Sequence, residues 1–256
     1  MTTGAVGDLP VPALVLEGTD WDALEHSMGP AGDTPQMLAD LLDADQRVRT
    51  QALDHLHHVV HHQNTLYDAT VPAALYVAAI LTDPRTSLPV DKEPHDAPGP
   101  LRAALLGWLG SVADAASDEA AASSRRCGFP PEDYPPFVQT CLLRPLLYRA
   151  VAAFFDAPDP HVREAAIDAC IPLLDDRRLT RHRHRLIPLL RDPLAVSEVW
   201  QYRERAIERL EAWGEDVTGL QLKRDAFAVC DSQDITPAST TATPDLLWNS
   251  ADDLPF

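Results

Sequence analysis

The segment DPHVREAAIDACIPL, residues 159–173, contains the pattern that decides the fold. Counting from Val162, small or apolar residues follow four, five, eight and eleven positions later. A helix has about 3.6 residues per turn, so this spacing puts all of them on one side of it. The same pattern recurs, and its four starting pairs are Val48-Arg49, Leu101-Arg102, Val162-Arg163 and Tyr202-Arg203. The sequence therefore predicts four copies of one amphipathic helix.

A repeated helix that cannot bury its own apolar stripe must stack on further copies of itself. Successive copies of the arginine are 53, 61 and 40 residues apart. The longer intervals contain two proline-rich insertions, at 82–100 and 117–136, which cannot be continuous helix. The partner helices are expected at about Thr34 to Leu42, Val71 to Leu81, Phe137 to Phe155 and Arg181 to Leu190. The predicted fold is all-α, a right-handed α-solenoid of about four helix pairs with two insertions.

Two of the windows resemble HEAT repeats, whose second helix typically begins Asp-x-x-Val-Arg-x-x-Ala. Residues 45–52 and 159–166 match this pattern, whereas Pro98 and Val199 replace the aspartate in the other two windows. The aspartate caps the first turn and opposes the positive end of the helix dipole. The repeated arginines are expected to form a ladder along the stack by pairing with turn carboxylates.

A second resemblance lies in the run HQNTLYDAT, residues 62–70, and in the Trp21 to Leu24 stretch. These segments are similar to parts of actinobacterial HEAT-like proteins, several of which look like immunity or interaction components. The resemblance covers about Trp21 to Gly214. It implies a bacterial scaffold for protein binding, and one hypothesis is an immunity protein that neutralises a basic toxin domain.

The expected domain organisation has three parts. Residues 1–20 are expected to be an extended N-terminal segment, and residues 21–214 the HEAT-like α-solenoid. Gly214 is expected to end the last helix, because glycine readily adopts the left-handed conformation of a helix C-cap. Residues 215–256 form a polar tail with an apolar end, which either folds back on the solenoid or binds in trans as a short motif.

The formal net charge of −18 and the pI near 4.7 favour a basic protein as partner. The same charge disfavours nucleic acid, because binding to phosphates depends on lysine and arginine. The alternative is a nucleic-acid-acting enzyme, similar to HEAT-like DNA glycosylases, that uses the basic stretch 177–191. We expect a cytoplasmic protein without membrane association, because no apolar run approaches about 18 residues and the N-terminus lacks signal-peptide features.

A histidine cluster at 55–62 is the strongest candidate for metal binding. The pairs His57/His61 and His58/His62 are four residues apart, a spacing that can chelate a metal from one helix face. Two ligands do not make a site, and the sequence has no HExxH or Cys-x-x-Cys motif. Nucleotide-binding and hydrolase motifs are also missing, so we expect no metal, no cofactor and no enzymatic activity.

Acidic residues between the core positions of the repeated helices are the predicted partner-binding site. They are expected to face solvent on the concave side of the stack, where a basic partner would dock. The predicted set is Asp54, Glu164, Asp168, Glu204, Glu208 and Glu211.

Overall fold

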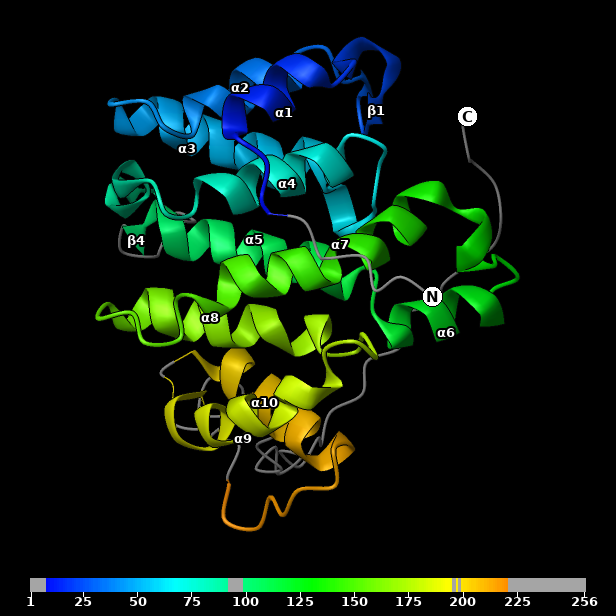
Figure 1. Ribbon diagram of the computed structural model, residues 1–256, viewed down its shortest axis with the longest axis vertical. Helices are drawn as coiled ribbons and strands as arrows, with labels where there is room; N and C mark the ends of the chain where they lie inside the picture. The colour runs from blue at the N-terminus through cyan, green and yellow to red at the C-terminus, as the bar shows by residue number, and fades with distance from the viewer. Residues whose placement is uncertain (1–7, 92–98, 195–196, 198, 221–256) are drawn as a thin grey trace, which may run out of the picture. The chain divides into compact units, whose positions relative to one another are not determined.

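The computed structural model describes residues 8–91, 99–194, 197 and 199–220, and these residues are mostly helical (Figure 1). The prediction of an all-α protein is thus confirmed. The helices are α1 (Pro12–Gly18), α2 (Thr34–Asp40), α3 (Gln46–His55), α4 (Thr70–Ile80), α5 (Leu101–Asp114), α6 (Asp118–Arg126), α7 (Pro135–Ala152), α8 (Pro160–Leu173), α9 (Arg183–Leu189) and α10 (Trp200–Ala212). Two antiparallel hairpins join β1 (Glu25–His26) to β2 (Gly29–Pro30) and β3 (Pro89–Val90) to β4 (Gly99–Pro100).

The four repeated windows coincide with α3, α5, α8 and α10. The residues four, five and eight positions after the first residue of each window are all buried, as an apolar stripe requires. At the last position of the pattern, eleven residues after the first, Val59 and Trp213 are only half-buried, because they lie past the ends of their α-helices. The apolar stripes therefore form one continuous core, as their spacing predicts.

The repeated helices follow one another along the long axis of Figure 1. The most extensive helix contact joins α5 to α8, and α10 also packs on α8. Gly110 permits the close approach of α5 to α8, because an added Cβ would lie 2.9 Å from Cα of Ala169. The partner helices α2, α4 and α7 pack against α3, α5 and α8.

The helix ends agree with the sequence signals. Asp45 and Asp159 accept hydrogen bonds from first-turn amides, whereas α5 and α10 begin without a side-chain cap. Gly214 has φ +80° and donates its N–H to Glu211 O at 2.9 Å, and the Glu215 N–H bonds to Leu210 O at 3.0 Å. These two bonds define a Schellman motif, which confirms the predicted end of the last repeat helix.

Three of the repeated arginines, Arg49, Arg102 and Arg163, differ from the prediction, because their described bonds to turns go to backbone carbonyls rather than to carboxylates. Arg49 is buried and donates to the carbonyls of Asp43, Ala44 and Pro89 at 2.7–2.9 Å. Arg163 donates to the carbonyl of Ala157 at 2.7 Å. Turn carbonyls have no partner of their own in a tight connection, so a long planar donor satisfies them.

Arg203 likewise donates to the carbonyl of Ser197. Arg102 donates to the carbonyls of Leu81 and Asp83, which follow α4. Each arginine thus fastens a turn to its helix, and Arg49 also reaches the β3 strand of the next repeat.

Two segments that were expected to lack helical structure each contain a helix. Within the second insertion, α6 forms because Ser117 caps it and two acidic residues occupy its first turn. Residues 12–18 form α1 rather than extended chain, with Pro12 at the first helical position. None of the helices in the described residues is long and apolar enough to cross a membrane. The apolar end of the predicted tail lies outside the described residues.

Candidate functional site

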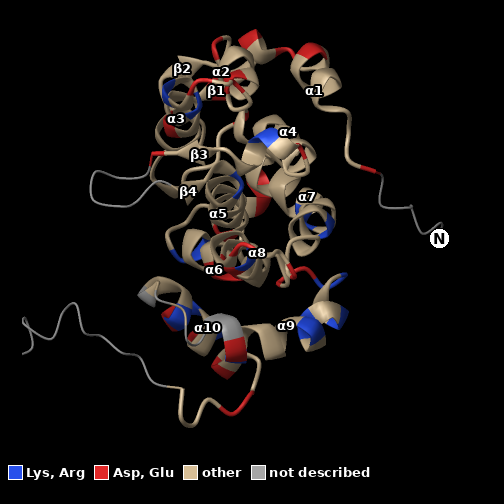
Figure 2. Ribbon diagram, turned by 90° about the vertical axis from the view of Figure 1, so that its left-hand side faces the viewer, with Lys and Arg blue, Asp and Glu red and all other residues tan. Residues whose placement is uncertain are grey.

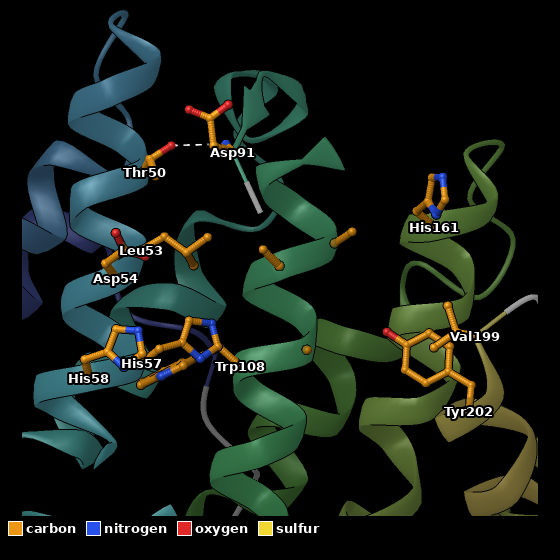
Figure 3. A pocket seen from close by; sticks show the side chains of 13 residues that line it. Thr50, Leu53, Asp54, His57, His58, Asp91, Trp108, His161, Val199 and Tyr202 are labelled. Atoms are coloured by element: carbon orange, nitrogen blue, oxygen red, sulfur yellow. Dashed lines mark hydrogen bonds between the residues drawn. The ribbon is translucent and has the colours of Figure 1, made fainter. Parts of the chain in front are cut away.

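A groove with a volume of about 670 Å³ lies across α3, α5, α8 and α10 (Figure 3). Because each helix contributes residues from one side, the groove follows the face that the repeats share. Its thirteen lining residues come from these four helices and their flanking segments, together with Asp91 of the first insertion.

The α3 side of the groove has the most polar side chains. Thr50, Asp54 and His58 are four residues apart and lie on one face of this helix and its continuation. The continuation, residues Leu56–Val60, is a π-helical turn that carries His57 and His58. Such turns are rare and are frequent at functional sites. Thr50 also accepts the Asp91 N–H at 3.1 Å, which holds the first insertion at the edge of the groove (Figure 3).

The floor is formed by small residues of α5 above a buried tryptophan. Ala103, Ala104 and Gly107 line the groove, and a Cβ added to Gly107 would meet nothing within 4 Å. Trp108 is fully buried, and its indole N–H donates to Leu56 O at 3.0 Å. This bond fixes the ring between α3 and α5, while the missing side chain at Gly107 leaves the space above α5 open.

The opposite side is formed by His161, Val199 and Tyr202 (Figure 3). Burial raises the pKa of Tyr202 to about 12, and the nearby carboxylates of Asp168 and Glu164 add to this effect. Its hydroxyl therefore remains protonated at neutral pH and can donate a hydrogen bond. His161 is exposed at the start of α8.

The carboxylates of the groove are not balanced by lysine or arginine among its described lining residues. Asp54 and Asp91 are the carboxylates of the lining, and no lysine or arginine is among the described lining residues. Asp91 accepts a hydrogen bond from Gln46 at 2.6 Å. Asp54 is exposed and has no hydrogen-bond or ion-pair partner within the described part of the chain. The groove thus offers a negative potential to a cationic group.

Of the six predicted partner-binding residues, the structure brings only Asp54 into this groove. Glu164 is half-buried and accepts a hydrogen bond from Ser197 at 2.6 Å. The remaining acids of the predicted set, Glu204, Glu208 and Glu211, form one stripe of α10. By helical spacing this stripe is about 120° away from Tyr202, Arg205 and Arg209. Glu208 and Glu211 are exposed on it, and Glu204 is half-buried.

Asp168 was expected to face solvent, and the structure corrects this. It is only 5% exposed, and its Oδ2 accepts a hydrogen bond from Arg205 of α10 at 2.7 Å. Burial raises its pKa to about 6, an effect that Arg205 opposes and Asp114 reinforces. Its Oδ1 is buried without a hydrogen-bond partner. A buried, paired carboxylate cannot offer its charge to a docking protein.

The histidine cluster is divided by the structure. His57 and His58 reach the groove, whereas His61 is buried against Trp108 with ring centroids 6.3 Å apart. Burial lowers the pKa of His61 to about 4, and the neighbouring His57 contributes. The backbone at His61 leaves the helical conformation, with φ −136° and ψ 64°. The pairs proposed from a four-residue spacing are therefore not on one regular helix.

The first histidine of the cluster, His55, comes close to His26 and Asp33. Their ligand atoms lie within 4.8 Å of one another, the separation a metal site needs. However, Nδ1 of His26 accepts the Met28 N–H at 3.1 Å, so the proton is on Nε2, which donates to Asp33 at 3.0 Å. A metal-bound Nε2 would require the opposite tautomer, with Nδ1 donating. These residues fit a hydrogen-bonded cluster better than a metal centre.

The basic stretch 177–191 is partly neutralised, although Lys and Arg still gather on α9 (Figure 2). Arg178 pairs with Asp176 at 2.6 Å, and Arg191 pairs with Glu215 at 2.8 Å. Arg183 lies over the ring of Trp213. The arginines of this stretch that remain exposed without a carboxylate are Arg177, Arg181 and Arg185.

Sequence patterns missed most of the groove. Tyr202 was assigned to the repeated pattern, and Asp91 was only part of the first proline-rich insertion. Trp108 gave no signal, because an apolar residue in an apolar helix is normally core.

The chain matches no family model, no curated protein and no solved structure.

Proposed function

We propose that the chain is a protein-binding scaffold in which HEAT-like helix pairs stack as a right-handed α-solenoid. Its groove across the second helices binds a basic protein. The observation that carries this proposal is the charge of the groove, which has two carboxylates and no lysine or arginine among its described lining residues. Solenoids commonly bind partners along a surface that extends over several repeats.

The partner, on this proposal, is a toxin domain whose basic active surface is covered in the cytoplasm of a bacterium. A net charge of −18 supports this role, because an acidic inhibitor is steered rapidly onto a basic target. The resemblance of residues 62–70 to HEAT-like immunity components supports it as well. Ion pairs at Arg178 and Arg191 reduce the charge available for a nucleic-acid partner.

The test compares proteins captured from native cell lysate by the wild type, by Asp54→Lys and by Glu119→Lys. Both variants change the charge equally, but Glu119 is exposed on α6 and does not line the groove. We expect one basic protein to be captured by the wild type and by Glu119→Lys, to be lost with Asp54→Lys, and to be released by salt. Identical capture by all three baits, or recovery of nucleic acid instead, would overturn the proposal.

A further inference from the structure

Two carboxylates border the α3 side of the groove. The backbone of Asp91 is held by Thr50 at 3.1 Å, and Asp54 lies one turn further along α3 (Figure 3). The Asp91 carboxylate accepts a hydrogen bond from Gln46, one turn in the other direction, so a cationic group that enters the groove meets the Asp54 carboxylate alone. Asp54 has no partner within the described residues, and both of its oxygens are available for a bidentate contact.

Beside these carboxylates is an apolar slot. Leu53 of α3 and the small residues Ala103, Ala104 and Gly107 of α5 line it. The open space at Gly107 leaves room for a chain of methylene groups over α5. Lysine and arginine have such a stem, which packs on apolar surface while the charged end reaches a polar group.

Two aromatic residues lie near this slot. Trp108 of α5 is fully buried beneath the floor, and Tyr202 lies on the opposite side of the groove. A guanidinium group has a planar fork of donors that fits both oxygens of a carboxylate, whereas an ammonium group makes no such paired contact. We propose that the anchor of the basic partner is an arginine side chain, which pairs with Asp54 and lays its stem over Gly107. This inference rests on the proposed function of the groove.

The test uses a small probe, so that it does not require the partner. The tripeptide N-acetyl-Gly-Arg-Gly-amide is titrated into ¹⁵N-labelled full-length protein, and its citrulline analogue, which has the same shape but no charge, serves as control. We expect the arginine peptide to bind about fivefold more tightly, the factor that a partly exposed charge pair provides. The peptide is also expected to shift the Trp108 indole N–H signal, and a lysine peptide is expected to bind more weakly.

Two variants locate the contact, and one controls for charge. Asp54→Asn should remove the preference for arginine over citrulline, and Gly107→Leu should abolish binding of both peptides, whereas Glu119→Gln should change neither. Equal affinity of the two peptides for the wild type, or no saturable binding, would overturn the arginine anchor. If the anchor fails but Asp54→Lys still loses the basic protein from lysate, the proposed function stands and only its chemistry is wrong.

Discussion

Replacing Gly110 by alanine tests the helix packing that shapes the groove. The added Cβ would lie 2.9 Å from Cα and 3.0 Å from Cβ of Ala169. The nearer of these is a backbone atom of α8, which cannot rotate away as a flexible side chain can. The two helices would therefore have to separate along the most extensive helix contact of the described chain.

The magnitude follows from two opposing effects. Overpacking of a well-packed core costs about 1–3 kcal/mol. Replacing a helical glycine by alanine returns about 0.5–1 kcal/mol through backbone entropy. We therefore expect Gly110→Ala to lose about 1–2 kcal/mol, which lowers Tm by about 2–8 °C in a chain of this size.

Gly107 provides the matched control, since it lies three residues earlier on the same helix and has no atom within 4 Å of its would-be Cβ. Gly107→Ala should gain about 0.5–1 kcal/mol and raise Tm, because only the entropy term applies. Thermal unfolding followed by circular dichroism measures both variants. An increase of Tm in Gly110→Ala similar to that in Gly107→Ala would refute the close approach of α5 and α8.

Two further predictions concern charged residues. The pKa of Asp168 is about 6 in the folded protein against a reference of 3.8, so the folded protein binds the proton of this carboxyl group more tightly than the unfolded chain does. The protein is therefore expected to lose about 2–3 kcal/mol of folding stability as the pH rises from about 4 to above 6. Asp168→Asn should not lose stability in this way. Urea unfolding at both pH values measures the difference in unfolding free energy between the variant and the wild type, and a difference that does not change with pH would contradict the burial of Asp168. Arg49→Ala should lower the folding stability by about 3 kcal/mol, because it leaves three carbonyls without their donor. Arg163→Ala, which removes one such bond, should lower it by about 1 kcal/mol, and Arg47→Ala should have little effect because Arg47 is exposed. Equal unfolding midpoints of the three arginine variants would mean that the carbonyl contacts contribute nothing.

The helices could be predicted because their signals are local. The apolar stripe repeats with the helical period, and the capping residues lie within one turn of each helix start. Of the expected partner helices, Thr34 to Leu42 and Val71 to Leu81 agree with α2 and α4 within two residues at each end. Ser117 caps α6 by the same local rule, but the prolines later in the insertion, at 130–131 and 135–136, led the segment to be assigned to a loop.

The position of Asp168 shows why burial was harder to predict. On a helical wheel it is about 180° from the centre of the α8 stripe, which predicts exposure. This argument assumes that only one face of a helix is covered. However, α8 contacts α5, α7 and α10, and Arg205 of α10 covers the carboxylate. A helix in the middle of a stack has several buried faces, and one sequence window does not contain the residues that cover them.

The groove illustrates the same limit more sharply. Gly107 and Gly110 are only about 60° apart around α5, yet one faces open space and the other contacts α8. The border between helix contact and groove thus falls within a narrow strip of the helix surface, and the spacing of the neighbouring helices decides where it lies. That spacing depends on residues such as Ala169, 62 positions after Gly107 in the chain. The open surface over Gly107 is therefore set by how α5 packs against its neighbouring helices, and only three-dimensional coordinates can locate it.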